Sequence, residues 1–146
     1  MKYMPMIEGR IRHRDIVMEY SQRVLKELGL GRLRTRPITI NFVSDAEGTH
    51  GYCLGDQDGV EIFISRKDPV TGGNASFMTM MQSLTHELVH AKQYLRGELK
   101  SEINWVWKGR NAEGYRYDNQ PWEREAHRLE KEIFWKCFPI DLEFRN

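Results

Sequence analysis

The sequence lacks the features that mark several large classes of protein. Its 146 residues contain two cysteines, Cys53 and Cys137, which are too few for a disulfide framework and form no Cys-x-x-Cys pair. No apolar run approaches the ~20 residues that a membrane-spanning helix requires, and the first residues do not resemble a secretory signal. We therefore expect a cytoplasmic protein that does not enter a membrane.

An excess of charge of one sign is also missing. The 22 basic and 21 acidic residues leave a net charge of +1, which gives no overall attraction to nucleic acid or to an anionic membrane. Two stretches, 9-GRIRHR-14 and 31-GRLRTRP-37, are locally basic and would contact phosphates if they faced the same way. Acidic residues such as Asp15 and Glu27 lie close to them in the sequence. We therefore interpret both stretches as solvated surface, and nucleic acid as a disfavoured partner.

Internal repeats and low-complexity linkers are absent as well, so we expect a single domain over residues 1–146. A hydrophobic fraction of 40% is enough to form one core. Hydrophobic periodicity and turn residues predict an α+β fold. The predicted elements are a helix at 10–28, a strand at 37–44, a hairpin of 51–55 and 60–66, a helix at 77–95, a short strand at 103–107 and a helix from 121 to about 138.

The clearest motif lies in the second predicted helix and reads 86-HELVH-90. Because a helix advances about 100° per residue, His86 and His90 project from one face about one turn apart, where both imidazoles can bind one metal ion. Glu87 lies beside them, near enough to take a proton from a metal-bound water without being a ligand. Apolar residues on both sides place the histidines near the buried side of the helix, where an unpaired imidazole would be costly. The motif therefore predicts a metal site.

A catalytic zinc site takes three protein ligands and leaves a fourth position for water, so a third ligand should follow further along the chain. The last predicted helix offers three candidates in 121-PWEREAHRLE-130. Glu123 and His127 are four residues apart beside an apolar stripe, which lets either one point toward the motif helix. Glu125 points about 200° away from Glu123. The spacing thus leaves Glu123 and His127 open as the third ligand, with Glu125 as a further alternative.

HELVH followed by a helix bearing Glu123-x-x-Ala126 resembles the gluzincin group of zinc metallopeptidases, and the compact layout resembles small zincin-like peptidases of phages and bacteria. The resemblance extends over about residues 60–133. It implies a zincin-like fold: an N-terminal helix, a small mixed sheet with an edge strand next to the HExxH helix, and a C-terminal helix carrying the third ligand. It also implies one Zn²⁺ held by His86, His90 and Glu123, with Glu87 as the general base.

The sequence can also be compared with three groups of zinc peptidases that share the HExxH motif. Gluzincins commonly have, four positions after the ligand glutamate, an acidic residue that orients a zinc-binding histidine, whereas this sequence has His127 there. Metzincins have Gly and His three and six residues after the second motif histidine, where this sequence has Gln93 and Arg96, so that class is excluded. SprT-like proteins, which act near DNA, use a third histidine, and His127 is the only histidine after the motif.

The implied activity is hydrolysis of peptide bonds in a peptide or protein substrate by a metal-activated water, with Glu87 as the general base. Tyr115, Tyr117 and His127 are candidates for a second-shell or oxyanion-stabilising donor. The strand 60-VEIFIS-65 would pair with an extended substrate if it formed the edge of the sheet.

Two alternatives come from other functional classes. One is a nucleic-acid-associated, SprT-like protease, whose phosphate contacts would weaken steeply with salt. The other is a non-catalytic metal-binding interaction module. The intact Glu87 disfavours this second alternative, because a structural metal site does not need a general base.

Overall fold

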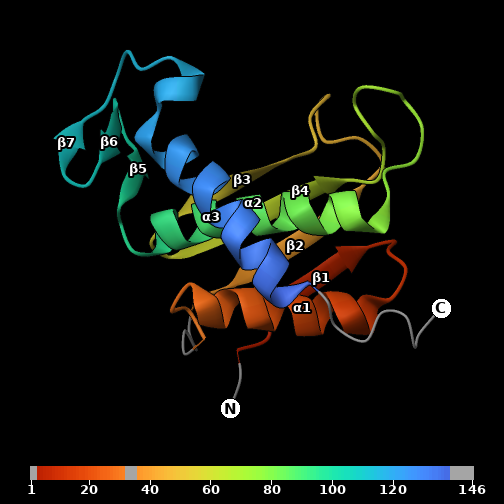
Figure 1. Ribbon diagram of the computed structural model, residues 1–146. Coiled ribbons are helices and arrows are strands. Elements are labelled where there is room, and N and C mark those ends of the chain that lie inside the picture. Colours follow the sequence, from red (N-terminus) through yellow and green to blue (C-terminus); the bar gives the residue numbers. More distant parts are fainter. Residues whose placement is uncertain (1–2, 32–35, 139–146) are drawn as a thin grey trace.

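The computed structural model describes residues 3–31 and 36–138 and has the predicted α+β architecture (Figure 1). Its helices are α1 (Arg14–Glu27), α2 (Phe77–Leu95) and α3 (Pro121–Cys137), and a 3-10 turn, η1 (Tyr117–Asn119), precedes α3. Its strands are β1 (Met6–Gly9), β2 (Ile38–Val43), β3 (Gly51–Asp56), β4 (Gly59–Ser65), β5 (Leu99–Ser101), β6 (Trp105–Trp107) and β7 (Arg110–Asn111). No helix among the described residues has the length and apolar character needed to cross a membrane.

The first helix starts later than its periodicity predicts, because the segment before it enters the sheet. Strand β1 pairs in parallel with β2, with Met6 opposite Thr39, and the chain then turns through His13, whose φ of 56° is left-handed, into α1. The sequence 6-MIEG-9 has no clear alternation, and its strand partner lies over thirty residues away. Such a short strand is defined by its neighbour rather than by its own residues.

The larger sheet has the strand order β1-β2-β4-β3. Strands β1, β2 and β4 are parallel, whereas β3 runs antiparallel to β4, as expected of the predicted hairpin. Residues 60–65 do not form a sheet edge, because β4 pairs with β2 on one side and with β3 on the other. Buried Val60, Ile62 and Ile64 alternate with less buried residues, but that alternation is the same in an inner and an edge strand. The edge strand next to α2 is β3.

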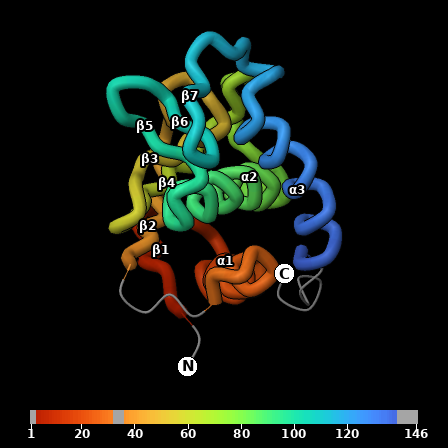
Figure 2. The backbone as a smooth tube through the Cα atoms, turned by 90° about the vertical axis from the view of Figure 1, so that its left-hand side faces the viewer, coloured from red at the N-terminus to blue at the C-terminus, as the bar shows by residue number. Residues whose placement is uncertain are grey.

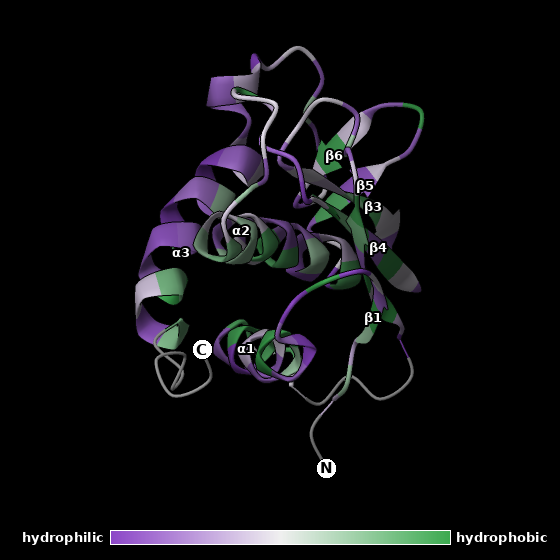
Figure 3. Ribbon diagram, turned by 90° about the vertical axis from the view of Figure 1, so that its right-hand side faces the viewer, coloured by the Kyte–Doolittle hydropathy of each residue, from purple (hydrophilic) through white to green (hydrophobic). Residues whose placement is uncertain are grey.

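The hydrophobic core includes residues of the larger sheet and of the helices α1, α2 and α3. Helix α2 packs on β3 and β4, and α3 packs on α2 and α1 on the side away from the sheet (Figure 2). Hydrophobic residues gather where α1, α2 and the sheet face one another (Figure 3). A buried hydrogen bond between the Tyr20 and Thr85 hydroxyls joins α1 to α2. Helix α2 is therefore covered on both sides, and its polar residues must be paired within the protein.

The smaller sheet, β5-β6-β7, follows α2 and leads toward α3. Its central strand corresponds to the predicted strand at 103–107. The Trp105 ring stacks on Trp122 at a centroid distance of 5.6 Å, and Trp122 is buried at the start of α3. This contact joins the smaller sheet to the first turn of α3.

Candidate metal centre

The two motif histidines lie on the side of α2 that faces α3. Ser76 is the N-cap of α2, and its hydroxyl accepts a hydrogen bond from the Thr79 amide at 3.0 Å. His86 and His90 are only 9% and 6% exposed, and their ring centroids are 4.8 Å apart. Two imidazoles this close and this buried need polar partners, which α3 supplies.

Glu123, in the first turn of α3, provides the carboxylate that both histidines share. One oxygen, Oε1, is 3.0 Å from His86 Nε2, and the other, Oε2, is 3.1 Å from His90 Nε2. One ligand atom from each residue lies within 4.8 Å of the other two. Tetrahedral ligands at ~2.1 Å from a zinc ion are ~3.4 Å from one another. The two distances from the histidine nitrogens to the Glu123 carboxylate are therefore slightly shorter than those between the ligands of such an ion.

The alternative third ligands take other positions. The Glu125 carboxylate is 2.8 Å from Lys92 Nζ and 3.1 Å from Gln93 Nε2, so it is engaged away from the histidines. His127 is exposed, and its ring centroid lies 4.7 Å from that of His86. His127 belongs to a second group, with His86 and Glu130, whose ligand atoms also lie within 4.8 Å of one another. The arrangement favours Glu123 as the residue that joins both histidines.

Two residues that the sequence reasoning missed hold the outer nitrogens of the motif histidines. Glu130 Oε1 is 2.9 Å from His86 Nδ1, and Gln93 Oε1 is 2.7 Å from His90 Nδ1. Such contacts orient metal-binding imidazoles and leave their other nitrogens for the metal. Glu130 was detectable as the acidic residue two helical turns after Glu123 on the same face, and Gln93 as the polar residue three positions after His90.

The fixed charges of the cluster set its protonation. Burial alone would lower the pKa of His86, but hydrogen bonds with Glu123 and Glu130 outweigh it and raise that pKa to about 10. Burial would also lower the pKa of His90. The hydrogen bond with Glu123 and the nearby charge of Glu87 outweigh burial, so that the pKa of His90 is raised. Burial would raise the pKa of Glu123, yet its bonds to the two histidines hold it far below the usual value. Without a metal the cluster is a set of charged hydrogen bonds.

Glu87 does not belong to either group of possible ligands. It is 6% exposed and lines the cleft described below. A Cβ added to Gly51 on β3 would lie 3.6 Å from Glu87 Cγ, so the edge strand passes closely over this side chain. Burial raises the pKa of Glu87, and the charges of His90 and His86 partly offset that effect.

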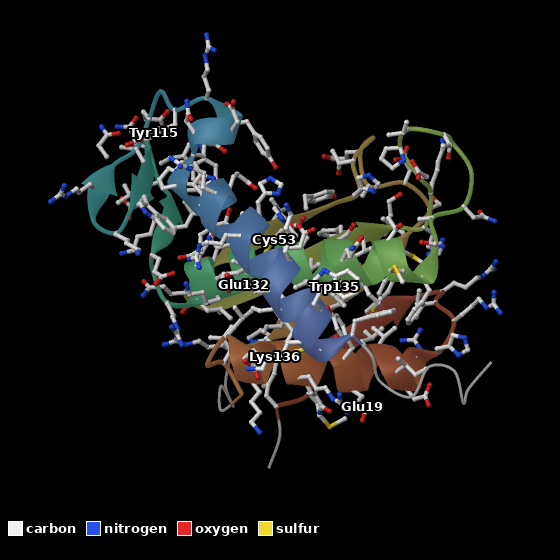
Figure 4. The ribbon with its side chains drawn as sticks, in the orientation of Figure 1. Glu19, Cys53, Tyr115, Glu132, Trp135 and Lys136 are labelled. Atoms are coloured by element: carbon white, nitrogen blue, oxygen red, sulfur yellow. The ribbon has the colours of Figure 1, made fainter. Side chains whose placement is uncertain are left out.

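A cleft of about 1030 Å³ opens onto the cluster between β3, α2, α3 and η1. Its lining includes Cys53 of β3, labelled in Figure 4. Of the three donor candidates, Tyr117 and His127 line the cleft and Tyr115 does not. The Tyr117 hydroxyl donates to Glu123 Oε1 at 3.1 Å, and its ring meets His127 edge-on at 6.2 Å. The lining contains three glutamates and no lysine or arginine.

The chain was compared with models of known protein families, with curated proteins and with solved structures, and none of them matches it. The function must therefore be inferred from the chemistry of the cluster itself. Two imidazoles and a carboxylate converge beside a glutamate in an open cleft, and their ligand atoms are close enough together that they could hold a metal ion.

Proposed function

We propose that this protein is a zinc-dependent metallopeptidase with a zincin-like fold. The observation that carries the proposal is the convergence of His86, His90 and Glu123, whose ligand atoms all lie within 4.8 Å of one another. The cluster is buried, yet it opens onto a cleft large enough for a peptide. A purely structural ion pair would need neither the cleft nor Glu87 beside it.

The donor set fits zinc better than other common divalent ions. Two imidazole nitrogens and one carboxylate oxygen suit a borderline-soft ion, whereas Mg²⁺ and Ca²⁺ prefer oxygen ligands alone. When bound, zinc would polarise a substrate carbonyl and lower the pKa of a water molecule toward ~7. Glu130 and Gln93 would hold the outer nitrogens of the two imidazoles during this chemistry.

The side chains around the cluster can carry out the proton transfers of peptide hydrolysis. Glu87 has a raised pKa, so its carboxylate is a stronger base than an exposed glutamate, and it accepts a proton from the attacking water. The same group then donates that proton to the leaving amine. Tyr117 and His127, which line the cleft, are the donors available to the oxyanion that forms in between.

The edge strand β3 is suited to bind the substrate. It lines the cleft from Gly51 to Leu54 and pairs with β4 on one side only. An extended peptide can therefore add to β3 as a further antiparallel or parallel strand, with its backbone beside Glu87. The peptide-binding strand that we propose is therefore β3, which precedes the strand considered from the sequence, β4.

The first test is the metal content of the purified protein and of single variants. The parent and Glu87→Gln should each hold about one zinc ion, whereas His86→Ala and Glu123→Ala should lose it. Glu125→Ala is the matched control on α3, because its carboxylate binds Lys92 and Gln93 instead. His127→Ala should also retain the ion. A parent protein that takes up no metal when zinc is supplied would end the proposal.

Catalysis is tested separately, on a library of short peptides. The parent should cleave at least one sequence, and Glu87→Gln should lower kcat by about 10²-fold or more while keeping its zinc. If the parent binds zinc but cleaves no peptide and no unfolded protein, the metal centre serves a binding module rather than an enzyme.

A further inference from the structure

A second hollow, of about 530 Å³, shares no lining residue with the metal cleft. It forms where β1 and β4 end and the chain turns toward α1 and α2 (Figure 1). In sheets with parallel strands, this carboxyl end is where small ligands commonly bind. The proposed peptidase does not use this hollow.

Positive charge is concentrated around this hollow. Arg10, Arg12, His13 and Arg66 line it, and no aspartate or glutamate does. The whole chain carries a net charge of only +1, so this grouping is local. The side chains of Arg10 and Arg12 make no hydrogen bond or ion pair with any residue that the structure describes. Their guanidinium groups are therefore available to an anion.

Arg66 is held in place by the ends of two strands. Its Nη1 donates to the Phe42 carbonyl at 2.5 Å and lies 3.4 Å from the Arg10 carbonyl. A guanidinium has five N–H donors in a rigid fork, so these contacts orient the group without using all of its donors. The hollow also adjoins the start of α2, whose first turn has no acidic residue and whose N-terminus adds a favourable dipole for negative charge.

Four of the six remaining lining residues are apolar, and Asn74 and Ser76 are polar. Ile11, Phe77 and Met80 contribute to it, and the His13 ring meets Phe77 edge-on at a centroid distance of 5.7 Å. Inorganic phosphate would leave most of this volume unfilled, since pockets of ~300–1,000 Å³ typically hold molecules of nucleotide size. The lining thus combines donors for phosphate with a surface for a flat apolar group.

The arrangement favours a small ligand over a nucleic-acid strand. The two basic stretches noted in the sequence begin at opposite ends of α1, because Arg12 precedes this helix and Gly31 follows it. Its 14 residues span about 21 Å. Residues 32–35 lie outside the described part of the chain. Arg10, Arg12 and Arg66 line one hollow at a single end of α1, which suits a compact ligand better than an extended strand.

We propose that this hollow binds a phosphorylated small molecule of the nucleoside phosphate class. Arg10, Arg12 and Arg66 hold the phosphate, and Ile11 and Phe77 contact the nucleoside. The proposal does not depend on the metal centre, because the two sites have no residue in common.

Isothermal titration calorimetry on the full-length protein tests this proposal, with ADP, GDP, CDP and UDP as probes. At least one should bind with a Kd below about 1 mM, and pyrophosphate and the matching nucleoside should each bind at least about tenfold more weakly. Arg12→Ala, which removes an exposed side chain, should weaken the nucleotide about tenfold or more through loss of a charge-assisted hydrogen bond. Arg110→Ala on β7 is the matched control and should leave binding unchanged.

Three outcomes would overturn the proposal. The first is that none of the four nucleotides binds at low salt. The second is that Arg12→Ala and Arg10→Ala each bind the nucleotide as strongly as the parent protein does. The third is tighter binding of a single-stranded oligonucleotide with a steep salt dependence, which would indicate contacts to several phosphates along a strand. Zinc content, measured on the same samples, reports separately on the metal centre.

Discussion

At the scale of single residues, the candidate metal site includes side chains that the HELVH motif does not indicate. Glu130 holds His86 Nδ1 at 2.9 Å, and Gln93 holds His90 Nδ1 at 2.7 Å. Both contacts leave Nε2 of the imidazole directed at Glu123. A carboxylate thus lies behind His86 and an amide behind His90, so the two imidazoles differ in the charge of their outer partners.

Replacing Glu130 tests whether it orients a metal ligand. Glu130→Gln should lower zinc affinity by about 10–100-fold while keeping one ion per protein, because the neutral amide holds His86 less firmly. Competition titration with a chelator measures the affinity. Glu132→Gln is the matched control, because Glu132 is an exposed glutamate on the same helix (Figure 4). Equal affinities in the two variants would contradict an orienting role for Glu130.

Protonation of the cluster leads to a second prediction. The pKa of His86 in the metal-free protein is about 10, above its ordinary value, so the proton on His86 competes with zinc at neutral pH. Binding of each zinc ion at about pH 7 should release about one to two protons, and affinity should rise between about pH 6 and about pH 8. Calorimetry in buffers of different ionisation enthalpy measures the release. Affinity that does not change with pH would contradict a charged His86.

The same shift has a defined effect on the metal-free fold. A raised folded pKa means that the ion pairs of His86 stabilise the fold fully below its unfolded value of about 6.5, and that this stabilisation is lost as the pH rises through about 10. Glu123 has the opposite dependence, since its pKa is depressed, and its contribution is lost in acid. The metal-free cluster is therefore most stabilising at mildly acidic pH.

At the scale of secondary-structure elements, the decisive contact is between α2 and α3. One helix carries His86, Glu87 and His90, and the other carries Glu123 and Glu130. Neither helix forms the cluster alone, so the spacing between them sets the geometry of the ligands. Ala126, with no exposed surface, lies on α3 between the two glutamates in sequence, and a small side chain there allows close packing.

A larger side chain at position 126 should therefore reduce both the stability of the fold and the affinity for zinc. Ala126→Leu should reduce the free energy of unfolding by about 1–3 kcal/mol, because the added carbons overpack a closed interface, and it should weaken zinc binding by moving Glu123. Urea denaturation and chelator competition measure the two effects. Arg128→Leu, on the exposed side of α3, introduces the same side chain as a control. Unchanged stability in Ala126→Leu would mean that the interface is loose.

At the scale of the whole molecule, the proposed metal centre lies between α2 and α3. Helix α2 packs on the sheet, and α3 reaches the remainder mainly through α2 and α1. A metal ion shared between α2 and α3 would bind the folded chain and not the unfolded one. Its binding free energy would then add to the stability of the fold.

Removal of zinc should consequently lower the melting temperature. With free zinc about 1,000-fold above Kd, the stabilisation is about 4 kcal/mol, which for a domain of this size corresponds to a rise in Tm of about 10 °C. Differential scanning calorimetry with zinc and with chelator measures the difference. Glu123→Ala is the control, and its Tm should not respond to zinc. A parent protein whose Tm is also unresponsive would refute metal binding to the folded state.

Much of the fold was predictable because its signals are local. Helical periodicity located α2 and α3, and the hairpin residues located β3 and β4. The strand β1, the order of the strands and the identity of the edge strand were not predictable, because they depend on pairing between distant segments. A strand's own residues say which face is buried but not which strands lie beside it.

For the candidate site, the sequence by itself determined that His86, Glu87 and His90 share one helix and that His86 and His90 lie one turn apart, because helix geometry acts within four residues. Only the tertiary structure decided which residue of α3 meets them. It brings Glu123 to both histidines and Glu130 to one, and it turns Glu125 toward Lys92. These contacts join residues 33 to 44 positions apart, so they depend on how the two helices pack rather than on either helix alone.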